Sequence, residues 1–206
     1  YNFEKQGYKT KYIPNIIEIS RYKYKRRINP SPNILWVRAF KQIYNPTLAI
    51  RVLREVKKTF PKAKLCMIGP KSDESYDETL YLINKYSLKE DVKITGVLDK
   101  ETWVEKSKDY DILINTTNFD NTPVSIIENM ALGLYIVSTN VGGMPYLVEN
   151  EKDAYLVEPD NEVLMANSII KVLQQPEVQV IDNARKKAES FDWNNVKKQW
   201  EDLIRL

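Results

Sequence analysis

Residues 112–143 read ILINTTNFDNTPVSIIENMALGLYIVSTNVGG, with an apolar run near each end and helix signals between them. Thr122 suits the N-cap of that helix, and Pro123 suits its first position, where a missing N–H costs nothing. Gly133 suits the left-handed residue that ends a helix. A strand, a helix and a second strand in direct succession form the repeating unit of a parallel α/β sheet.

The same alternation runs along most of the chain. Short apolar runs rich in β-branched residues occur between segments of helical spacing, and their continuous apolar character indicates strands covered on both faces. The predicted strands are Ile34–Val37, Leu65–Ile68, Val92–Thr95, Ile112–Asn115, Tyr135–Ser138 and Tyr155–Val157. The predicted helices are one that Asn45 and Pro46 open and Pro61 follows, then Glu78–Tyr86, Lys100–Lys106, Pro123–Leu132, Glu162–Leu173 and Val178–Ser190. This order predicts an α/β fold with a doubly wound parallel sheet, which is Rossmann-like.

Two carboxylates flank the predicted start of the helix after residues 112–115. Asp120 precedes it and Glu128 follows eight residues later. Doubly wound sheets bind ligands beyond the carboxyl ends of their strands, which is where these residues fall. The free N–H groups of Val124 and Ser125 would point out of the helix N-terminus, a natural anion site. The combination predicts a site for a phosphorylated, hydroxyl-rich ligand.

The composition argues against several classes of function. With 31 basic and 28 acidic residues among 206, the net charge of +3 is too balanced to indicate nucleic-acid binding. No apolar run is long enough to cross a membrane, and no signal-peptide pattern occurs. The one cysteine, Cys66, falls in a predicted buried strand, so we expect a reducing, cytoplasmic location. Histidine is absent, so acid–base chemistry would have to use carboxylates, another domain or the substrate.

The two ends of the chain differ from the middle. The first 33 residues contain a basic run, Arg21–Arg27, and a linker-like segment, Asn29–Pro32. Such a run is usually a solvated face, and contact with anionic lipid headgroups is the alternative. Residues 191–206 carry apolar side chains at helical spacing, which predicts an amphipathic helix that needs a covering surface.

The chain resembles the C-terminal half of the group 1 (family 4) retaining glycosyltransferases, which are two-domain enzymes of the GT-B fold. The segments that carry the resemblance are Ile13–Asn15, Ile34–Arg38, Asp120–Glu128, Met130–Gly133, Val141–Pro145 and Phe191–Trp193. The resemblance implies that residues 1–33 are the end of the acceptor domain and the interdomain linker, and that 34–190 bind the nucleotide sugar. Residues 191–206 would then be a helix that packs back on the missing N-terminal domain.

The resemblance also implies roles for individual residues. Glu128 would accept hydrogen bonds from ribose hydroxyls, and Asp120 would hold donor-sugar hydroxyls. Arg38 would bind the diphosphate and stabilise the leaving group, so Arg38 and Asp120 are the implied catalytic residues. The implied donor-binding set is Arg38, Lys41, Asp120, Asn121, Thr122, Pro123, Val124, Ser125 and Glu128. The turn Thr95–Leu98 is where we expect base recognition. The family needs no metal, so none is expected here, and no cofactor beyond a UDP- or GDP-type sugar substrate.

The chain departs from the family pattern at two positions. The first glutamate of the family's pair is Asp120, one methylene shorter. The family usually places a lysine five residues after the arginine, where this chain has Ile43, and Lys41 is the substitute on the same loop. One missing phosphate cation would weaken binding by about 1.5–3 kcal/mol.

The implied function is the donor-binding half of a retaining hexosyltransferase. Its acceptor would be a saccharide or glycolipid, bound mainly by the missing N-terminal domain, in polysaccharide assembly. The protein would act in the cytoplasm, or at the inner face of the membrane as a peripheral protein, and this fragment alone would bind nucleotide but transfer sugar poorly. The alternatives are a non-catalytic nucleotide-sugar-binding domain, which the missing lysine favours, and a GT-B-fold epimerase, which would normally need histidines. A dinucleotide-dependent oxidoreductase is disfavoured, because no G-x-G-x-x-G follows the first strand.

Overall fold

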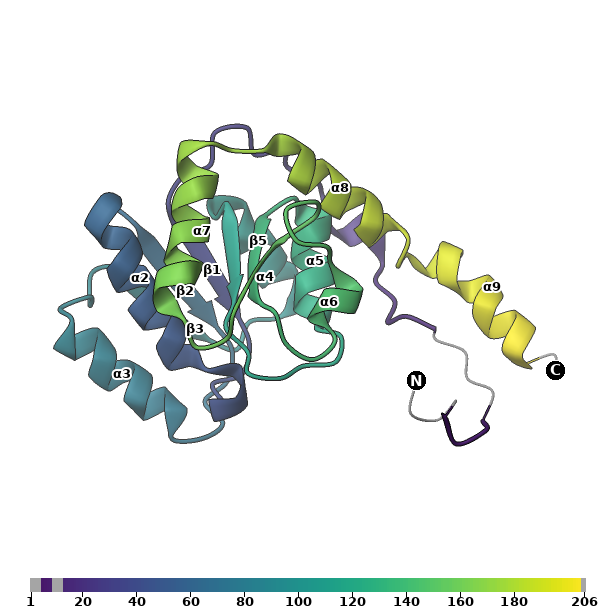
Figure 1. Ribbon diagram of the computed structural model, residues 1–206, viewed down its shortest axis with the longest axis horizontal. Helices are drawn as coiled ribbons and strands as arrows, with labels where there is room; N and C mark the ends of the chain where they lie inside the picture. Colours follow the sequence, from purple (N-terminus) through teal and green to yellow (C-terminus); the bar gives the residue numbers. More distant parts are fainter. Residues whose placement is uncertain (1–4, 9–12, 205–206) are drawn as a thin grey trace.

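A computed structural model of the chain describes residues 5–8 and 13–204. Within them, parallel strands form one sheet in the order β3-β2-β1-β4-β5-β6 (Figure 1). The strands are β1 (Asn33–Val37), β2 (Lys64–Ile68), β3 (Val92–Gly96), β4 (Ile112–Asn115), β5 (Tyr135–Thr139) and β6 (Tyr155–Val157). The chain moves outward from β1 to β3, crosses back to β4 and then moves outward to β6. The predicted doubly wound, Rossmann-like sheet is therefore confirmed, and its switch point lies between β1 and β4.

Helices cover both faces of this sheet. They are α2 (Pro46–Thr59), α3 (Ser75–Lys85), α4 (Lys100–Lys106), α5 (Val124–Leu132), α6 (Met144–Leu147), α7 (Glu162–Gln174), α8 (Val178–Glu189) and α9 (Trp193–Ile204). Short 3-10 turns are η1 (Ile19–Arg21), η2 (Gln42–Tyr44) and η3 (Ser107–Asp109). α2 packs against α3 and α7 on one face, and α5 packs against α8 on the other. Alternate strand residues feed the two resulting cores: Trp36 points to the first and Leu35 to the second.

Local signals placed most element boundaries correctly. All predicted strands are present within one residue of their predicted limits. The Asn45 side chain accepts a hydrogen bond from Leu48 N–H at 3.2 Å, as expected for the N-cap of α2. Gly133 ends α5 with φ of 80°, as predicted. α3 begins at Ser75, earlier than predicted, because the Asp73 carboxylate accepts the Ser75 N–H at 3.0 Å.

The predicted start of α5 is wrong by one residue. The helix begins at Val124, Pro123 occupies the N-cap, and no described side chain caps its first turn. Pro123 has an extended ψ of 110°, and its carbonyl accepts the N–H of Ile126 at 3.0 Å. Thr122 is therefore not the N-cap, because the extended Pro123 holds that position and Thr122 lies one residue outside it.

The basic run Arg21–Arg27 packs against the sheet domain. Arg27 is 3% exposed, and its Nε lies 3.0 Å from the Asp111 carboxylate. Arg26 pairs with Asp182 on α8 at 2.7 Å. The interpretation of the whole run as a solvated face is therefore wrong, because a buried guanidinium requires such partners. Contact with a membrane stays a prediction, and no described helix is long and apolar enough to cross one.

Two distant segments of the chain meet beside α8. The N–H of Ile17 donates to the carbonyl of Phe191 at 3.0 Å, and the N–H of Trp193 donates to the carbonyl of Ile17 at 3.3 Å. Beyond this contact α9 extends away from the sheet (Figure 1). Its side chains Trp200 and Ile204 are exposed, in keeping with the predicted need for cover. The three-part division at residues 33 and 190 stays a prediction, and parts of both ends lie outside the described residues.

Candidate functional site

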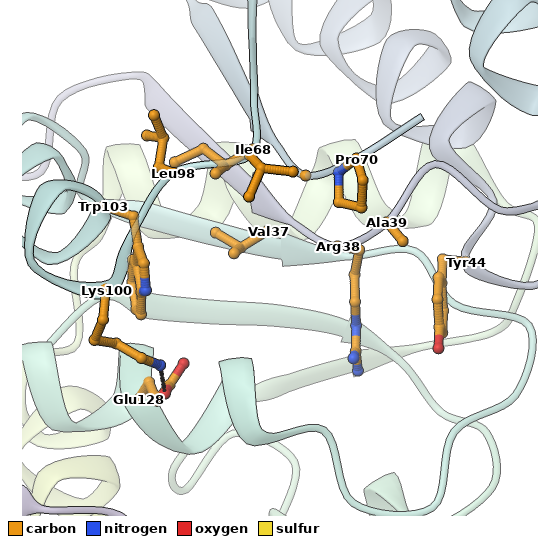
Figure 2. Close-up of a pocket in the computed structure, with 12 residues that line it drawn as sticks. Val37, Arg38, Ala39, Tyr44, Ile68, Pro70, Leu98, Lys100, Trp103 and Glu128 are labelled. Atoms are coloured by element: carbon orange, nitrogen blue, oxygen red, sulfur yellow. Dashed lines mark hydrogen bonds and ion pairs between the residues drawn. The ribbon is translucent and has the colours of Figure 1, made fainter. Parts of the chain in front are cut away.

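A cleft of about 450 Å³ opens at the carboxyl ends of the strands around the switch point (Figure 2). The loop after β1 supplies Arg38 and Tyr44, and the turn after β3 supplies Val97 and Leu98. Helices α4 and α5 complete the wall. The cleft therefore lies where the doubly wound topology predicts a ligand site. Among the described residues no cluster of His, Cys, Asp and Glu side chains could hold a metal ion.

Arg38 and Asp120 meet in an ion pair although they lie 82 positions apart. Arg38 directly follows β1, and Nη2 of its guanidinium donates to Oδ2 of Asp120. The guanidinium also lies 4.9 Å from the centre of the Tyr44 ring. Both charged side chains are only partly exposed, 17% and 15%, so water screens the pair weakly. Arg38 Nε is buried and has no hydrogen-bond partner among the described residues.

The Gly-Gly pair after β5 holds the Asp120 loop in place. The N–H of Gly143 donates to the Asp120 carbonyl at 2.7 Å. A Cβ at Gly143 would lie 1.6 Å from the carbonyl oxygen of Asn121, and Gly142 has φ of 56°. A side chain would therefore collide with backbone at this point. The pair allows a tight turn, as predicted, and it also permits this close approach.

The start of α5, the helix that supplies Glu128 to the cleft, offers free backbone donors. The N–H groups of Val124 and Ser125 have no acceptor among the described residues, because they precede the first intrahelical hydrogen bond. Asn121 and Thr122 lie next to them and line a second hollow of about 410 Å³, together with Tyr146. Of the predicted donor-binding residues on this segment, Glu128 lines the cleft and Asn121 and Thr122 line the second hollow. The others line neither: Asp120, Pro123, Val124 and Ser125.

Glu128 is buried, with 5% exposure, in the second turn of α5. Its Oε1 accepts a hydrogen bond from the Tyr22 hydroxyl at 2.8 Å and an ion-paired hydrogen bond from Lys100 Nζ. Glu128 is therefore not a solvated glutamate on a helix surface. Trp103 borders this cluster, since its ring lies 6.4 Å from that of Tyr22 and 5.3 Å from Lys100 Nζ.

Lysine positions differ from what the sequence predicts. Lys41 is exposed, precedes η2 and is not among the residues that line the cleft. Lys100 lines the cleft instead, from the first turn of α4. Its place shortly after the strand that ends at Gly96 could have marked it, because that edge of the sheet binds ligands. Nothing local marks Tyr22, whose partner Glu128 is 106 residues away.

Comparison with known proteins decides the family. The family model described as "Glycosyl transferases group 1" matches residues 19–189. The chain belongs to this family. Among curated relatives, a component of the phosphatidylinositol N-acetylglucosaminyltransferase of Arabidopsis thaliana is 24% identical over 92% of this chain and 42% of its own length. An uncharacterized glycosyltransferase of Haemophilus influenzae is 25% identical over 75% of this chain and 44% of its own length. The chain thus spans less than half the length of these two curated relatives.

Solved structures show the same fold. Anabaena HepE in complex with UDP and glucose matches with a TM-score of 0.83 and 19% identity, over 94% of this chain and 56% of that one. The C-terminal domain of the group 1 protein LpcC from Francisella tularensis matches with a TM-score of 0.73 and 14% identity, over 84% of this chain and 97% of that one. The chain is therefore a Rossmann-like domain of the GT-B type, and it corresponds to a C-terminal-like part of its homologues.

Proposed function

We propose that the chain is the donor-binding half of a retaining glycosyltransferase that takes a hexose from a UDP- or GDP-type sugar. The observation that carries the proposal is that Arg38 and Glu128 line one cleft at the switch point of the sheet, with Asp120 paired to Arg38. A cation, two carboxylates and a free helix N-terminus match a ligand that is both phosphorylated and rich in hydroxyls. Three HepE structures hold UDP, UDP and glucose, or UDP-glucose, which supports a nucleotide sugar here.

In this proposal Arg38 binds the diphosphate. Asp120 occupies only Nη2 of the guanidinium, and Arg38 Nη1 has no partner among the described residues. A diphosphate oxygen can therefore approach the other side of the fork. Negative charge grows on the leaving diphosphate during transfer, and a fixed guanidinium in a partly buried site stabilises it. The N–H groups of Val124 and Ser125 add neutral donors for the same anion.

Glu128 would bind the ribose and Asp120 the donor sugar. A carboxylate is an acceptor that matches the hydroxyls of a ribose, and Glu128 lies at the α4 side of the cleft beside Val97 and Leu98. The exposed Val97 and half-buried Leu98 leave an apolar surface for the base. The acceptor, a saccharide or glycolipid, would be bound mainly by the N-terminal half of the full protein. We place this transfer in the cytoplasm or at the inner face of its membrane.

One observation favours a second candidate, a non-catalytic nucleotide-sugar-binding domain. Ile43 occupies the usual lysine position, and Lys41 stays outside the cleft. Such a domain would bind the nucleotide but would not stabilise the leaving group fully.

Calorimetric titration of the chain with UDP, GDP and ADP tests the proposal. We expect UDP or GDP to bind. The affinity should fall at least tenfold in Arg38→Ala, because the substitution removes charge-assisted hydrogen bonds of about 1.5–3 kcal/mol. Absence of affinity for all three nucleotides would overturn the assignment. A full-length protein that binds the nucleotide but shows no sugar transfer would favour the second candidate.

A further inference from the structure

One oxygen of Glu128 receives two donors that come from separate parts of the chain. Tyr22 lies in the segment before β1, and Lys100 is the first residue of α4. Both donate to Oε1 of Glu128. A carboxylate oxygen has two lone pairs, so Oε1 has no acceptor capacity left. No described residue donates to Oε2.

Both donors are themselves held in place. Tyr22 is 4% exposed, and its carbonyl accepts a hydrogen bond from Arg185 Nη1 on α8 at 2.8 Å. A tyrosine hydroxyl is protonated at neutral pH, and burial together with the hydrogen bond to Glu128 raises the pKa of Tyr22 further in favour of that donating form. Lys100 Nζ lies 5.3 Å from the centre of the Trp103 ring, a cation–π distance. These contacts limit the rotamers of the carboxylate's two partners.

The two donors, Tyr22 and Lys100, also offset the free-energy cost of burying the Glu128 carboxylate. An isolated buried carboxylate is strongly destabilising, whereas one that accepts from a cation and a hydroxyl is tolerated. Figure 2 shows Lys100 and Glu128 at one end of the cleft and Arg38 at the other. The Lys100 ammonium is thus committed to Glu128 and lies away from the arginine that would hold the phosphates.

We propose that Tyr22 and Lys100 are positioning residues that lock Glu128 with Oε2 presented to the vicinal hydroxyls of a ribose. This inference rests on the proposed function, because it deepens the assignment of Glu128 to the ribose. In this inference Tyr22, which lies in the segment before the sheet domain, contributes to the specificity of the donor site. The three residues Tyr22, Lys100 and Glu128 would together favour nucleotides with a 2′,3′-diol over nucleotides that lack it.

The test compares two ligands on each variant of the full chain. Calorimetry measures affinity for UDP and for 2′,3′-dideoxy-UDP, and the guanosine pair is titrated in parallel. The variants are Tyr22→Phe and Lys100→Met, and Lys100→Arg is the conservative variant. We expect the preference for the diol form to fall about three- to tenfold in each of the first two, the effect of one hydrogen bond, with dideoxy affinity unchanged. Lys100→Arg should recover most of the preference.

Matched controls come from the segment before β1, which also holds Tyr22, and from η3, which directly follows α4. Tyr24→Phe removes a hydroxyl that bonds to Asp182 at 2.5 Å, outside the cleft. Lys108→Met removes a lysine paired with Glu105 on the surface. Neither control should change the preference. A thermal unfolding midpoint for every variant confirms that it is folded.

Failure of this inference is separable from failure of the proposed function. If Glu128→Gln abolishes the diol preference but Tyr22→Phe and Lys100→Met keep it, the positioning role is overturned and the ribose assignment survives. The positioning role is also overturned if Tyr22→Phe and Lys100→Met weaken the binding of UDP and of 2′,3′-dideoxy-UDP equally. Tighter UDP binding in Lys100→Met would overturn it as well. If the parent chain binds nucleotide without any diol preference, the positioning role and the ribose assignment are both overturned. If it binds no nucleotide at all, the proposed function is overturned with them.

Discussion

Asp120→Asn tests how the Arg38–Asp120 pair behaves when a ligand arrives. The substitution keeps the shape of the side chain but removes the negative charge that engages Arg38 Nη2. In the free protein a diphosphate can reach Nη1 of the guanidinium without competition, but it must compete with this carboxylate for Nη2. A charge-assisted hydrogen bond contributes about 1.5–3 kcal/mol, so relief from the competition should strengthen UDP binding by about tenfold at the lower limit.

The same change should weaken the fold. Arg38 and Asp120 are 17% and 15% exposed, which places the pair between a surface and a buried ion pair. We expect the free energy of unfolding to fall by roughly 1–2 kcal/mol, because Arg38 loses its charged partner. Urea unfolding measures this loss, and calorimetry with UDP and UDP-glucose measures affinity. The gain should be larger for UDP than for UDP-glucose, since Asp120 is proposed to hold donor-sugar hydroxyls.

Asp160→Asn is the matched control, because Asp160 pairs with Arg51 at the surface and outside the cleft. It should leave both affinities unchanged. If Asp120→Asn weakens UDP binding as Arg38→Ala does, the reasoning is wrong. Asp120 would then hold Arg38 ready for the ligand and would not compete for it.

The remaining predictions concern the anion, the loop and pH. Arg38→Ala should lower UDP affinity tenfold or more and flatten its dependence on salt, which calorimetry at two ionic strengths checks. Gly143→Ala should cost roughly 1–3 kcal/mol in urea unfolding, because its Cβ would lie 1.6 Å from the Asn121 carbonyl; unchanged stability would contradict this close approach. Burial raises the pKa of Asp111, but hydrogen bonds from Ser31 and nearby cations outweigh it and hold that pKa below its usual value. The resulting stability is complete above the unfolded pKa of about 3.9 and is lost as pH falls through the folded pKa. The free energy of unfolding should therefore fall less steeply with decreasing pH in Asp111→Asn than in the parent protein. Identical pH dependence in the two proteins would show that Asp111 does not contribute to acid sensitivity.

What could be predicted from the sequence was mostly local. Strand limits, the Asn45 cap and the Gly133 stop depend on neighbours within a few positions, and all three were confirmed. Arg38 and Asp120 could be placed at one sheet edge because both follow strands of a doubly wound fold. Their direct pairing was not predicted, since side-chain partners depend on rotamers that spacing does not encode.

The parts that were missed depend on long-range packing. Tyr22 and Glu128 lie 106 residues apart, so no periodicity relates them. Arg27 belongs to a run whose charge suggested solvent, yet its guanidinium is buried against Asp111 and the backbone of Leu132. The N-cap of α5 is Pro123, one residue after the predicted Thr122. Single-residue preferences do not resolve a helix start to within one position.

The backbone contact between Ile17 and the segment Phe191–Trp193 makes the intervening chain a closed module. Its entry and exit lie one hydrogen bond apart, at 3.0 Å between Ile17 N and Phe191 O. Adjacent ends allow a domain to be exchanged or inserted without stretching its host. If the module binds the sugar donor as proposed, grafting a different donor domain between the same two points would change the sugar delivered and leave the rest of the host protein as it was.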